Sequence, residues 1–258
     1  MKEPQTDPAG IRVAVIGARG RMGSTVCKAV ADAPDMALVA EIDQHDDLAR
    51  TLRDSRADVA VDFSVPSATE ANVMTAIDAG VHIVVGATGW DDDSLGRVAA
   101  RLREAANGAG VLVAPNFSLS AVLTMTFAAK AARYFESVEI IELHHPAKVD
   151  APSGTAKHTA AAIARARRDA GRGPSPDATE SGFEARGAVV DGVHVHAVRL
   201  RGLVAHEEVL LGNPGEQLVI RQDSFERTSF MPGVLLGIRQ IASRPGLTVG
   251  LEHFLDLA

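Results

Sequence analysis

The sequence predicts an α/β fold in which a doubly wound parallel sheet is followed by an α+β region with mostly antiparallel strands. The first observation is that short, nearly fully apolar runs alternate with segments of helical period up to Asn116, as expected for strands buried on both faces. The second is that several strand-like runs separated by glycine-containing turns occupy the later half. The third is size: 258 residues with 46% hydrophobic and 23% charged side chains supply one large core or two smaller ones.

The first half of the chain reads as strands alternating with helices. Predicted strands span residues 11–16, 37–42, 58–63, 81–85 and 110–114, and predicted helices span residues 21–33, 67–79 and 91–107. In the first of these helices, Met22, Val26 and Val30 recur at close to helical spacing. Because strands and helices alternate, the strands are expected to pair in parallel with helices on both faces of the sheet.

The second half has a different character. A long helix is predicted over residues 118–135, a strand over 138–144, an Ala-rich helix over about 155–170, and three further strands over 193–200, 206–211 and 217–222. The glycine-containing turns between the three strands favour antiparallel pairing, so this half is predicted to be α+β rather than another βαβ repeat. A last amphipathic helix follows Met231, with Val234, Leu235 and Ile238 on one face.

Composition excludes several classes of function. The 26 basic and 33 acidic side chains give a net charge of −7, which excludes a basic nucleic-acid-binding surface. The single cysteine, Cys27, forms no intramolecular disulfide and no structural zinc site, which favours the cytoplasm. Residues 1–10 contain no apolar stretch of the kind found in signal peptides. The longer apolar runs fall short of the ~18 residues that a membrane span needs, so no membrane association is expected.

A glycine-rich loop stands between the first predicted strand and the first predicted helix. It reads Gly17-Ala18-Arg19-Gly20-Arg21-Met22-Gly23, and such loops let backbone N–H groups and a helix amino end approach a pyrophosphate. Asp43 follows the second strand, where an acid is expected to bind the ribose hydroxyls of a dinucleotide. The combination favours a dinucleotide over a purely structural turn or another phosphate ligand. Arg19 and Arg21 favour the extra phosphate of NADPH whereas Asp43 repels it, so NADH and NADPH both stay open.

Three later strand ends are expected to line the same cleft, because ligands of open parallel sheets bind beyond the carboxyl ends of the strands. These are Phe63 after the third strand, the turn Gly86-Ala87-Thr88 after the fourth, and Ala114-Pro115-Asn116-Phe117 after the fifth. Each turn alone is an ordinary strand-to-helix connection. Because all three segments follow the carboxyl ends of parallel strands, they are predicted to make additional contacts with the cofactor.

The densest chemistry lies in the segment Glu142-Leu-His-His-Pro-Ala-Lys-Val-Asp-Ala-Pro-Ser-Gly-Thr-Ala156. His144 and His145 supply a proton donor near neutral pH and Lys148 supplies a mobile positive charge. Ser153, Gly154 and Thr155 start the next helix and offer N–H groups and hydroxyls suited to a carboxylate. Alternatively, Ser153 only caps the helix, Lys148 is only solvated, and the pair His144 and His145 only ends a strand. His194 and His196 share one face of a strand, but no cysteine or HExxH pattern accompanies them, so no metal site is expected.

These motifs resemble the 4-hydroxy-tetrahydrodipicolinate reductase family, also called dihydrodipicolinate reductase, which acts in the diaminopimelate route of lysine biosynthesis. The resemblance runs in order from Ile11 to the tail around Leu251 and is most specific in the segment His144 to Thr155. It implies a Rossmann-like dinucleotide-binding domain built from residues 1–118 and 226–258. It also implies a central domain, residues 119–225, that binds substrate and forms a homotetramer through an open sheet.

The resemblance also implies residue roles and a reaction. His144 is the general acid/base, Lys148 the second catalytic group, and His145, Ser153, Gly154 and Thr155 bind the substrate's carboxylates. The glycine-rich loop, Asp43, Phe63, and the turns at residues 86–88 and 114–117 bind NADH or NADPH. The reaction is reduction of 4-hydroxy-tetrahydrodipicolinate, a cyclic imine, to tetrahydrodipicolinate with loss of water. The family commonly has two threonines where this chain reads Ala87-Thr88, so a hydroxyl contact from position 87 is missing.

Two other hypotheses remain open at this point. One is a dinucleotide-binding module without catalytic activity, which has no chemical reason to keep His144, Lys148 and Thr155 together. The other is a related reductase or dehydrogenase of a different small carboxylated imine, such as an amino-acid dehydrogenase. The predicted pocket for paired carboxylates argues against a monocarboxylate substrate.

Overall fold

A six-stranded sheet organises the first part of this computed structural model, which describes residues 10–180 and 185–257. Its strands are β1 (Ile11–Ile16), β2 (Met36–Ile42), β3 (Val59–Asp62), β4 (His82–Val85), β5 (Gly110–Val113) and β11 (Gly246–Val249). The strand order is β11-β5-β4-β3-β1-β2, and every pairing is parallel. The predicted doubly wound parallel sheet is therefore confirmed.

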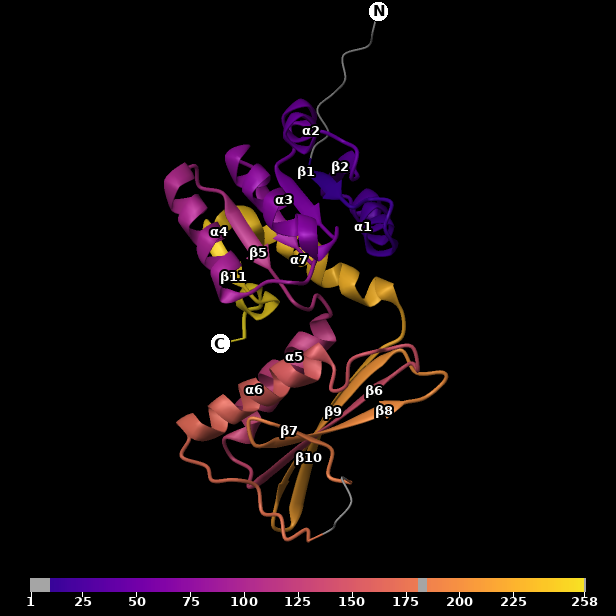
Figure 1. The fold of residues 1–258 in the computed structure, drawn as a ribbon, viewed down its shortest axis with the longest axis vertical. Coiled ribbons are helices and arrows are strands. Elements are labelled where there is room, and N and C mark those ends of the chain that lie inside the picture. The colour runs from indigo at the N-terminus through magenta and orange to yellow at the C-terminus, as the bar shows by residue number, and fades with distance from the viewer. Residues whose placement is uncertain (1–9, 181–184, 258) are drawn as a thin grey trace, which may run out of the picture. The chain divides into compact units, whose positions relative to one another are not determined.

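Helices cover both faces of this sheet (Figure 1). They are α1 (Arg21–Asp32), α2 (Leu48–Ser55), α3 (Pro66–Asp78), α4 (Asp92–Ala105) and α7 (Met231–Gln240). Successive strand residues point to opposite faces. Ala14 and Ile16 of β1 accordingly join the buried cluster that includes Leu52, Val73 and Val98 from the helices α2, α3 and α4. Helices α1 and α7 contact each other and cover the other face.

The order of strands reverses direction at β1. From β1 the chain moves outward to β2 on one side, and then returns to β3 on the other side before continuing to β4 and β5. The carboxyl ends of β1 and β3 therefore flank the position where an open α/β sheet offers its ligand crevice. This topology places the glycine-rich loop, which follows β1 directly, at that position.

A second, five-stranded sheet belongs to the central part of the chain. Its strands are β6 (Ser137–His144), β7 (Ala188–Val190), β8 (Val193–Arg199), β9 (Ala205–Asn213) and β10 (Glu216–Ser224), in the order β10-β9-β6-β8-β7. Helices α5 (Leu119–Ala132) and α6 (Gly154–Asp169) lie side by side on one face (Figure 1). Val138 and Ile140 of β6 meet Ala160 and Ile163 of α6 in a fully buried layer between helices and sheet.

One predicted pairing in the second sheet is wrong. Strand β8 does not pair with β9; it pairs in parallel with β6, which also pairs with β9 on its other edge. The reason is that α6 forms a crossover connection from β6 to β8, which makes parallel pairing possible. The central half therefore contains a βαβ connection that the sequence interpretation excluded. The other three pairings are antiparallel, as the fold class predicts.

The sequence did not predict three elements of secondary structure, one helix and two short strands. Helix α2 has only eight residues and a single buried side chain, Leu52, so it contains too few apolar residues to be recognised from the sequence. Strands β7 and β11 contain three and four residues, too short for a reliable alternation pattern. Strand β11 adds a sixth strand beside β5, so the C-terminal segment completes the first sheet. The expectation for the amino-terminal segment concerns residues 1–9, which lie outside the described residues.

The chain divides into two compact units. The first unit runs to Phe117 and resumes at Phe230, and the second spans Ser118–Ser229. The sequence placed the corresponding boundaries after residues 118 and 225. Within the described ranges, no helix combines the length and apolar character that crossing a membrane requires.

Candidate functional site

The glycine-rich loop of the first unit is shaped by close backbone contacts. Gly17 has φ +76°, and a Cβ on it would lie 2.9 Å from the carbonyl oxygen of Phe63. A Cβ on Gly23 would lie 2.0 Å from the carbonyl oxygen of Gly17, so helix α1 packs directly on the loop. Gly20 precedes α1 without a side-chain cap, and the first N–H groups of a helix have no partner inside it. The loop therefore offers backbone donors to an anion.

A cavity of about 430 Å³ opens beside this loop at the carboxyl ends of β1, β2 and β3. Gly17 and Gly20 line one part of the cavity and Asp43 another. The remaining lining comes mainly from the segments that follow β2 and β3: Gln44, Asp46, Leu48, Phe63, Ser64, Val65, Ala68 and Asn72, together with Ile16 and Ile42. The cavity lies where the topology predicts a ligand crevice, and it combines apolar walls with a few polar groups, as cofactor sites do.

One of the two loop arginines, Arg19, lies close to Asp43. The Nε of Arg19 lies 4.0 Å from Oδ2 of Asp43, and the Arg19 side chain is 85% exposed. Oδ1 of Asp43 accepts a hydrogen bond from the backbone N–H of Gln44 at 2.9 Å. Arg21 is also exposed. The carboxylate is thus held at the cavity, whereas both arginine side chains extend into solvent.

A buried carboxylate supports the loop after β3. Asp62 is fully buried, and its carboxylate accepts hydrogen bonds from the backbone N–H of Ser64 at 2.7 Å and from Thr69 Oγ1 at 2.8 Å. Asn72 donates to Asp62 at 3.2 Å and to the Ser64 hydroxyl at 3.1 Å. Two residues of this network, Ser64 and Asn72, line the cavity, so Asp62 helps to fix the shape of the cavity wall.

The turns after β4 and β5, at residues 86–88 and 114–117, also lie close to Phe63. A Cβ on Gly86 would lie 2.1 Å from the Phe63 ring, and the rings of Phe63 and Phe117 stand 5.8 Å apart. Ala87 is almost fully buried, whereas Thr88 and Pro115 are exposed. The backbone N–H of Ala114 donates to the carbonyl of Val85. The turns at residues 86–88 and 114–117 therefore lie at the carboxyl ends of β4 and β5, but they do not line the cavity beside the glycine-rich loop.

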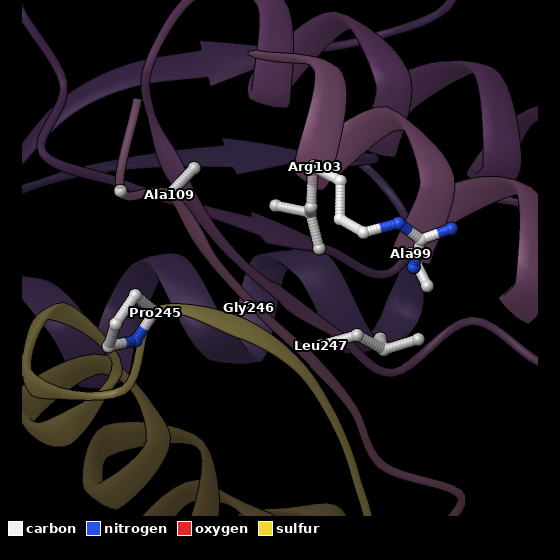
Figure 2. Close-up of a pocket in the computed structure, with 8 residues that line it drawn as sticks. Ala99, Arg103, Ala109, Pro245, Gly246 and Leu247 are labelled. Carbon is white, nitrogen blue, oxygen red and sulfur yellow. The ribbon is translucent and has the colours of Figure 1, made fainter. Parts of the chain in front are cut away.

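A second, more open cavity of about 480 Å³ lies at the opposite end of the same sheet. Figure 2 shows Arg103 of α4 beside Ala109, Pro245 and Leu247. Ala109 precedes β5 and Pro245 precedes β11, so this cavity borders the amino ends of two strands. Its one ionisable lining group is Arg103, and the topological rule for ligand sites does not apply at this edge.

In the second unit, the end of β6 and the start of α6 are joined through one carboxylate. Glu142 is fully buried, and its Oε2 lies 2.5 Å from Nδ1 of His144. Arg199 of β8 donates to both oxygens of Glu142, at 2.8 Å and 2.9 Å. The backbone N–H of Ser153 donates to Oε1 at 3.1 Å. We call Glu142, His144, Arg199 and Ser153 the Glu142 cluster.

The residues around this cluster are more exposed. Lys148 Nζ lies 2.6 Å from Oδ1 of Asp150, and the Lys148 side chain is 24% exposed. The Ser153 hydroxyl accepts from the N–H of Ala156, so this residue caps α6, as one sequence interpretation proposed. His145 and Gly154 are exposed and Thr155 is half-buried. The segment thus presents an ammonium group, an imidazole and a helix amino end on one short stretch of chain.

Burial and hydrogen bonding set the charge states of the cluster. Burial opposes ionisation of Glu142, but the hydrogen bonds from Arg199 and His144 prevail and lower the pKa of Glu142. Burial lowers the pKa of His144 despite the neighbouring Glu142 carboxylate, and the positive charges of Lys148 and Arg199 add to the lowering. The neutral imidazole and the ionised carboxylate are therefore favoured near neutral pH.

A second buried carboxyl lies directly across the sheet from Glu142. Glu207 of β9 is opposite Glu142 in the strand register. Burial raises the pKa of Glu207 to about 7, although a hydrogen bond from Thr159 opposes the increase. Within the described residues its Oε2 is buried without a hydrogen-bond partner.

Sequence reasoning missed the structural roles of Glu142, Arg199 and Asp62. Glu142 shares a strand face with His144, a two-residue spacing that the sequence displays. The contact of Arg199 with Glu142 spans 57 residues, so no local pattern contains it. His194 and His196 contact the Arg186 carbonyl and the Glu139 carboxylate, respectively. Among the described residues, no group of three or more metal-binding side chains converges.

The comparisons with known proteins agree across the whole chain. Residues 11–117 match the family model described as dihydrodipicolinate reductase, N-terminus, and residues 120–255 match the model described as dihydrodipicolinate reductase, C-terminus. The chain is 66% identical to 4-hydroxy-tetrahydrodipicolinate reductase of Beutenbergia cavernae, covering 96% of this chain and 99% of that protein. For the Streptomyces coelicolor protein of the same name, identity is 58% with 96% and 98% coverage.

A solved structure gives the same result for the fold. The dipicolinate-bound dihydrodipicolinate reductase from Paenisporosarcina sp. TG-14 superimposes with a TM-score of 0.87 at 36% sequence identity. The superposition covers 95% of this chain and 100% of that chain. Both units are therefore represented in a relative of known structure.

Proposed function

The chain belongs to the dihydrodipicolinate reductase family, and from this premise we propose that it reduces 4-hydroxy-tetrahydrodipicolinate to tetrahydrodipicolinate with loss of water. The reaction belongs to the diaminopimelate route of lysine biosynthesis. The observation that carries the proposal is the segment from His144 to Thr155, where a proton-transfer group and a lysine stand beside an anion-binding helix start. This combination suits a small dicarboxylate.

The first unit binds the nicotinamide cofactor, which supplies a hydride when bound. The cavity beside the glycine-rich loop supports this role, because a Cβ at Gly17 or Gly23 would collide with the backbone of the loop and its neighbours and displace the donors that a pyrophosphate needs. Asp43 accepts hydrogen bonds from ribose hydroxyls. The proposed cofactor residues are Gly17, Ala18, Arg19, Gly20, Arg21, Met22, Asp43, Phe63, Gly86, Ala87, Thr88, Ala114, Pro115, Asn116 and Phe117.

We propose that both NADH and NADPH serve as cofactors. Asp43 lies at the cavity and favours the free ribose hydroxyls of NADH. Arg19 and Arg21 are exposed long side chains that can turn toward the additional phosphate of NADPH. The contact between Arg19 and Asp43 supports exchange between the two cofactors, because the arginine neutralises the carboxylate that would repel the phosphate.

The second unit binds the substrate and moves a proton. Lys148, His145 and the amino end of α6 at Ser153, Gly154 and Thr155 bind the carboxylates, and the helix dipole adds to the attraction. His144 exchanges a proton with the substrate ring or with a water that it orients, so that charge does not accumulate during reduction. Orientation of the dianion is the main contribution of Lys148.

Two further properties belong to the proposal. The enzyme is cytoplasmic, in agreement with its single buried cysteine. It forms a homotetramer through the β10-β9-β6-β8-β7 sheet, whose edge strand β10 exposes Leu218 and Val219. Light scattering coupled to size-exclusion chromatography tests the assembly, and a monomer in solution would refute it.

Nicotinamide absorbance provides the direct test of the reaction. Purified protein is added to substrate formed in place from pyruvate and aspartate semialdehyde by the preceding synthase, with NADH and NADPH in parallel. We expect oxidation of both cofactors that depends on both precursors. If a protein that binds NADH oxidises neither cofactor, the chain is a binding module or acts on another substrate.

A further inference from the structure

The Glu142 cluster contains two residues, Glu142 and Arg199, to which neither the sequence motif nor the proposed reaction gives a role. Glu142 does not face solvent, yet it is charged and contacts the proposed acid/base residue directly. We infer that Glu142 is a positioning residue, which together with Arg199 holds His144 in the tautomer protonated at Nδ1 and leaves Nε2 to exchange the proton. The inference rests on the proposed function for the identity of the reaction.

The tautomer follows from a count of donors and acceptors. Arg199 offers only donors, and it donates to both oxygens of Glu142. The backbone N–H of Ser153 is also a donor, so three contacts require that the carboxylate accept. An ionised carboxylate has no proton to give, and the 2.5 Å contact with His144 therefore requires a hydrogen on Nδ1. In a neutral imidazole, Nε2 is then the acceptor.

Arg199 is needed because a buried carboxylate is costly without a partner. Its guanidinium matches both carboxylate oxygens in the two-pronged arrangement that fixes orientation as well as charge. The same guanidinium donates to the carbonyl of Asp150 at 2.7 Å. One side chain thereby connects the acid/base residue to the loop that carries Lys148.

The charged groups facing His144 are Glu142 from its own strand, Lys148 from the following loop and Arg199 from β8. Lys148 and Arg199 disfavour the imidazolium, and Glu142 is the group that favours it. When Nε2 takes up a proton during turnover, the Glu142 carboxylate stabilises the resulting positive charge. Removing the charge of Glu142 should therefore let the His144 ring adopt other orientations, and it should also disfavour the imidazolium form.

The test compares Glu142→Gln with Glu207→Gln as a matched control. Both residues are buried carboxyls at facing positions of neighbouring strands, but Glu207 contacts Thr159 rather than His144. Nitrogen-15 NMR of the histidine side chains reports the tautomer, with the His144 signal assigned by its loss in His144→Gln. Turnover against pH, NADH binding and dipicolinate binding are measured on the same samples.

We expect wild-type His144 to show a protonated Nδ1 and an unprotonated Nε2, and Glu142→Gln to show a mixture of tautomers. Turnover of Glu142→Gln should fall about 100-fold, within the range that general acid–base catalysis contributes. The His144-dependent limb of its pH profile should move to lower pH, because the group that favours the imidazolium is gone. Binding of NADH and dipicolinate should stay within about twofold of wild type, and Glu207→Gln should match wild type in the His144 tautomer and in turnover.

The outcomes are separable. A wild-type His144 protonated at Nε2 overturns the inference even if Glu142→Gln does not fold. An unchanged tautomer and pH profile in a folded Glu142→Gln variant also overturns it. If the wild-type protein oxidises neither cofactor, the proposed function fails, whereas the NMR comparison still decides whether Glu142 orients His144.

Discussion

Two helix amino ends, one in each unit, offer donors to an anion, but they are built in different ways. The start of α1 has no side-chain cap and is shaped by Gly17 and Gly23, whose missing side chains allow backbone to approach backbone. The start of α6 is capped by Ser153 and tied to the sheet by Glu142 and Arg199. The first site is formed by backbone groups that the glycines allow to come close together. The second site is formed by charged side chains that hold one another by hydrogen bonds. We call them the backbone-built site and the side-chain-built site.

This difference fits the functions proposed for the two sites. A pyrophosphate needs many N–H donors at short range and no proton transfer, so a glycine-rich backbone is sufficient. A reacting substrate needs a proton at a defined place, and a ring nitrogen is fixed only by a partner that is itself fixed. The Glu142 cluster is thus the more demanding structure, because it needs two strands and a helix start in register.

The largest effect should follow from filling the backbone-built site. A Cβ at Gly23 would come within 2.0 Å of the Gly17 carbonyl oxygen, so Gly23→Ala must displace the loop. We expect the NADH dissociation constant to rise by about 100-fold or more, measured by fluorescence titration. Dipicolinate binding, measured by calorimetry, should persist because the second unit is unaltered.

The matched control for this change is Gly96→Ala. Gly96 lies within α4, and a Cβ there meets nothing within 4 Å. We expect a gain of about 0.5–1 kcal/mol in stability and unchanged NADH affinity, because alanine only lowers the entropy of the unfolded chain. Unchanged NADH affinity in Gly23→Ala as well would contradict the assignment of the loop.

An effect of similar size should come from the side-chain-built site. His144→Gln removes the proton-transfer group, and we expect turnover to fall by about 100- to 1,000-fold with little change in NADH affinity. Lys148→Ala should reduce both turnover and substrate affinity, because the ammonium binds a carboxylate as well as orienting it. Steady-state kinetics with direct NADH titration separate the two variants. Equal loss of NADH binding in both would argue against this division of roles.

The sequence predicts Gly17, Gly20, Asp43 and Phe63 of the cavity lining, because their determinants are local, but it does not predict the lining that Gln44, Leu48 and Asn72 supply. Gly17, Gly20 and Gly23 follow a strand and open a helix, and Asp43 follows the next strand, so spacing alone brings them together. The parallel sheet is predictable for the same reason. Its nearly continuous apolar strands are what burial on both faces requires. The short strand β11 was missed because pairing with β5, rather than its own pattern, makes it a strand.

The side-chain-built site is predictable only in its local part. His144, Lys148 and Ser153 lie within one segment and carry recognisable chemistry. Arg199 arrives from β8 because α6 forms a crossover that places β8 beside β6, and the sequence interpretation had placed β8 beside β9 instead. An error in strand order therefore concealed the partner of Glu142. Packing across the sheet, not propensity, decides that partner.

A smaller effect concerns the buried layer beneath the second site. The pKa of Glu207 is raised to about 7 in the folded chain, so the folded state binds this proton more tightly than the unfolded state. Stability should therefore fall as pH rises from the unfolded pKa, about 4.3, through about 7. Glu207→Gln should remove this loss, making the variant more stable than wild type by about 3 kcal/mol at pH 8 and by only about 1 kcal/mol at pH 5.

Thermal unfolding at the two pH values measures this directly. For a chain of this size we expect the melting temperature of Glu207→Gln to exceed that of wild type by about 5 °C or more at pH 8. An equal difference at pH 5 would mean that packing around Thr159, rather than ionisation, is responsible. Because Glu207 does not contact His144, turnover should stay unchanged.

The smallest effect tests how Lys148 is shared between the protein and the substrate. In the structure Lys148 is paired with Asp150 at 2.6 Å, and this hydrogen bond is the main reason that the pKa of Asp150 is lowered. A substrate carboxylate must replace Asp150 as the partner of the ammonium group. Asp150→Asn should therefore tighten dipicolinate binding by about two- to fivefold, which corresponds to the free energy of a partly exposed ion pair.

Calorimetric titration at low and high salt distinguishes competition from orientation. If Asp150 competes with the substrate, the gain in affinity should shrink as salt screens both ion pairs. If dipicolinate binds more weakly to Asp150→Asn at both salt concentrations, Asp150 instead holds Lys148 in its binding position. In that case the second site would depend on two carboxylates, with Asp150 fixing the lysine as Glu142 is inferred to fix the histidine, and side-chain positioning would extend to its exposed edge.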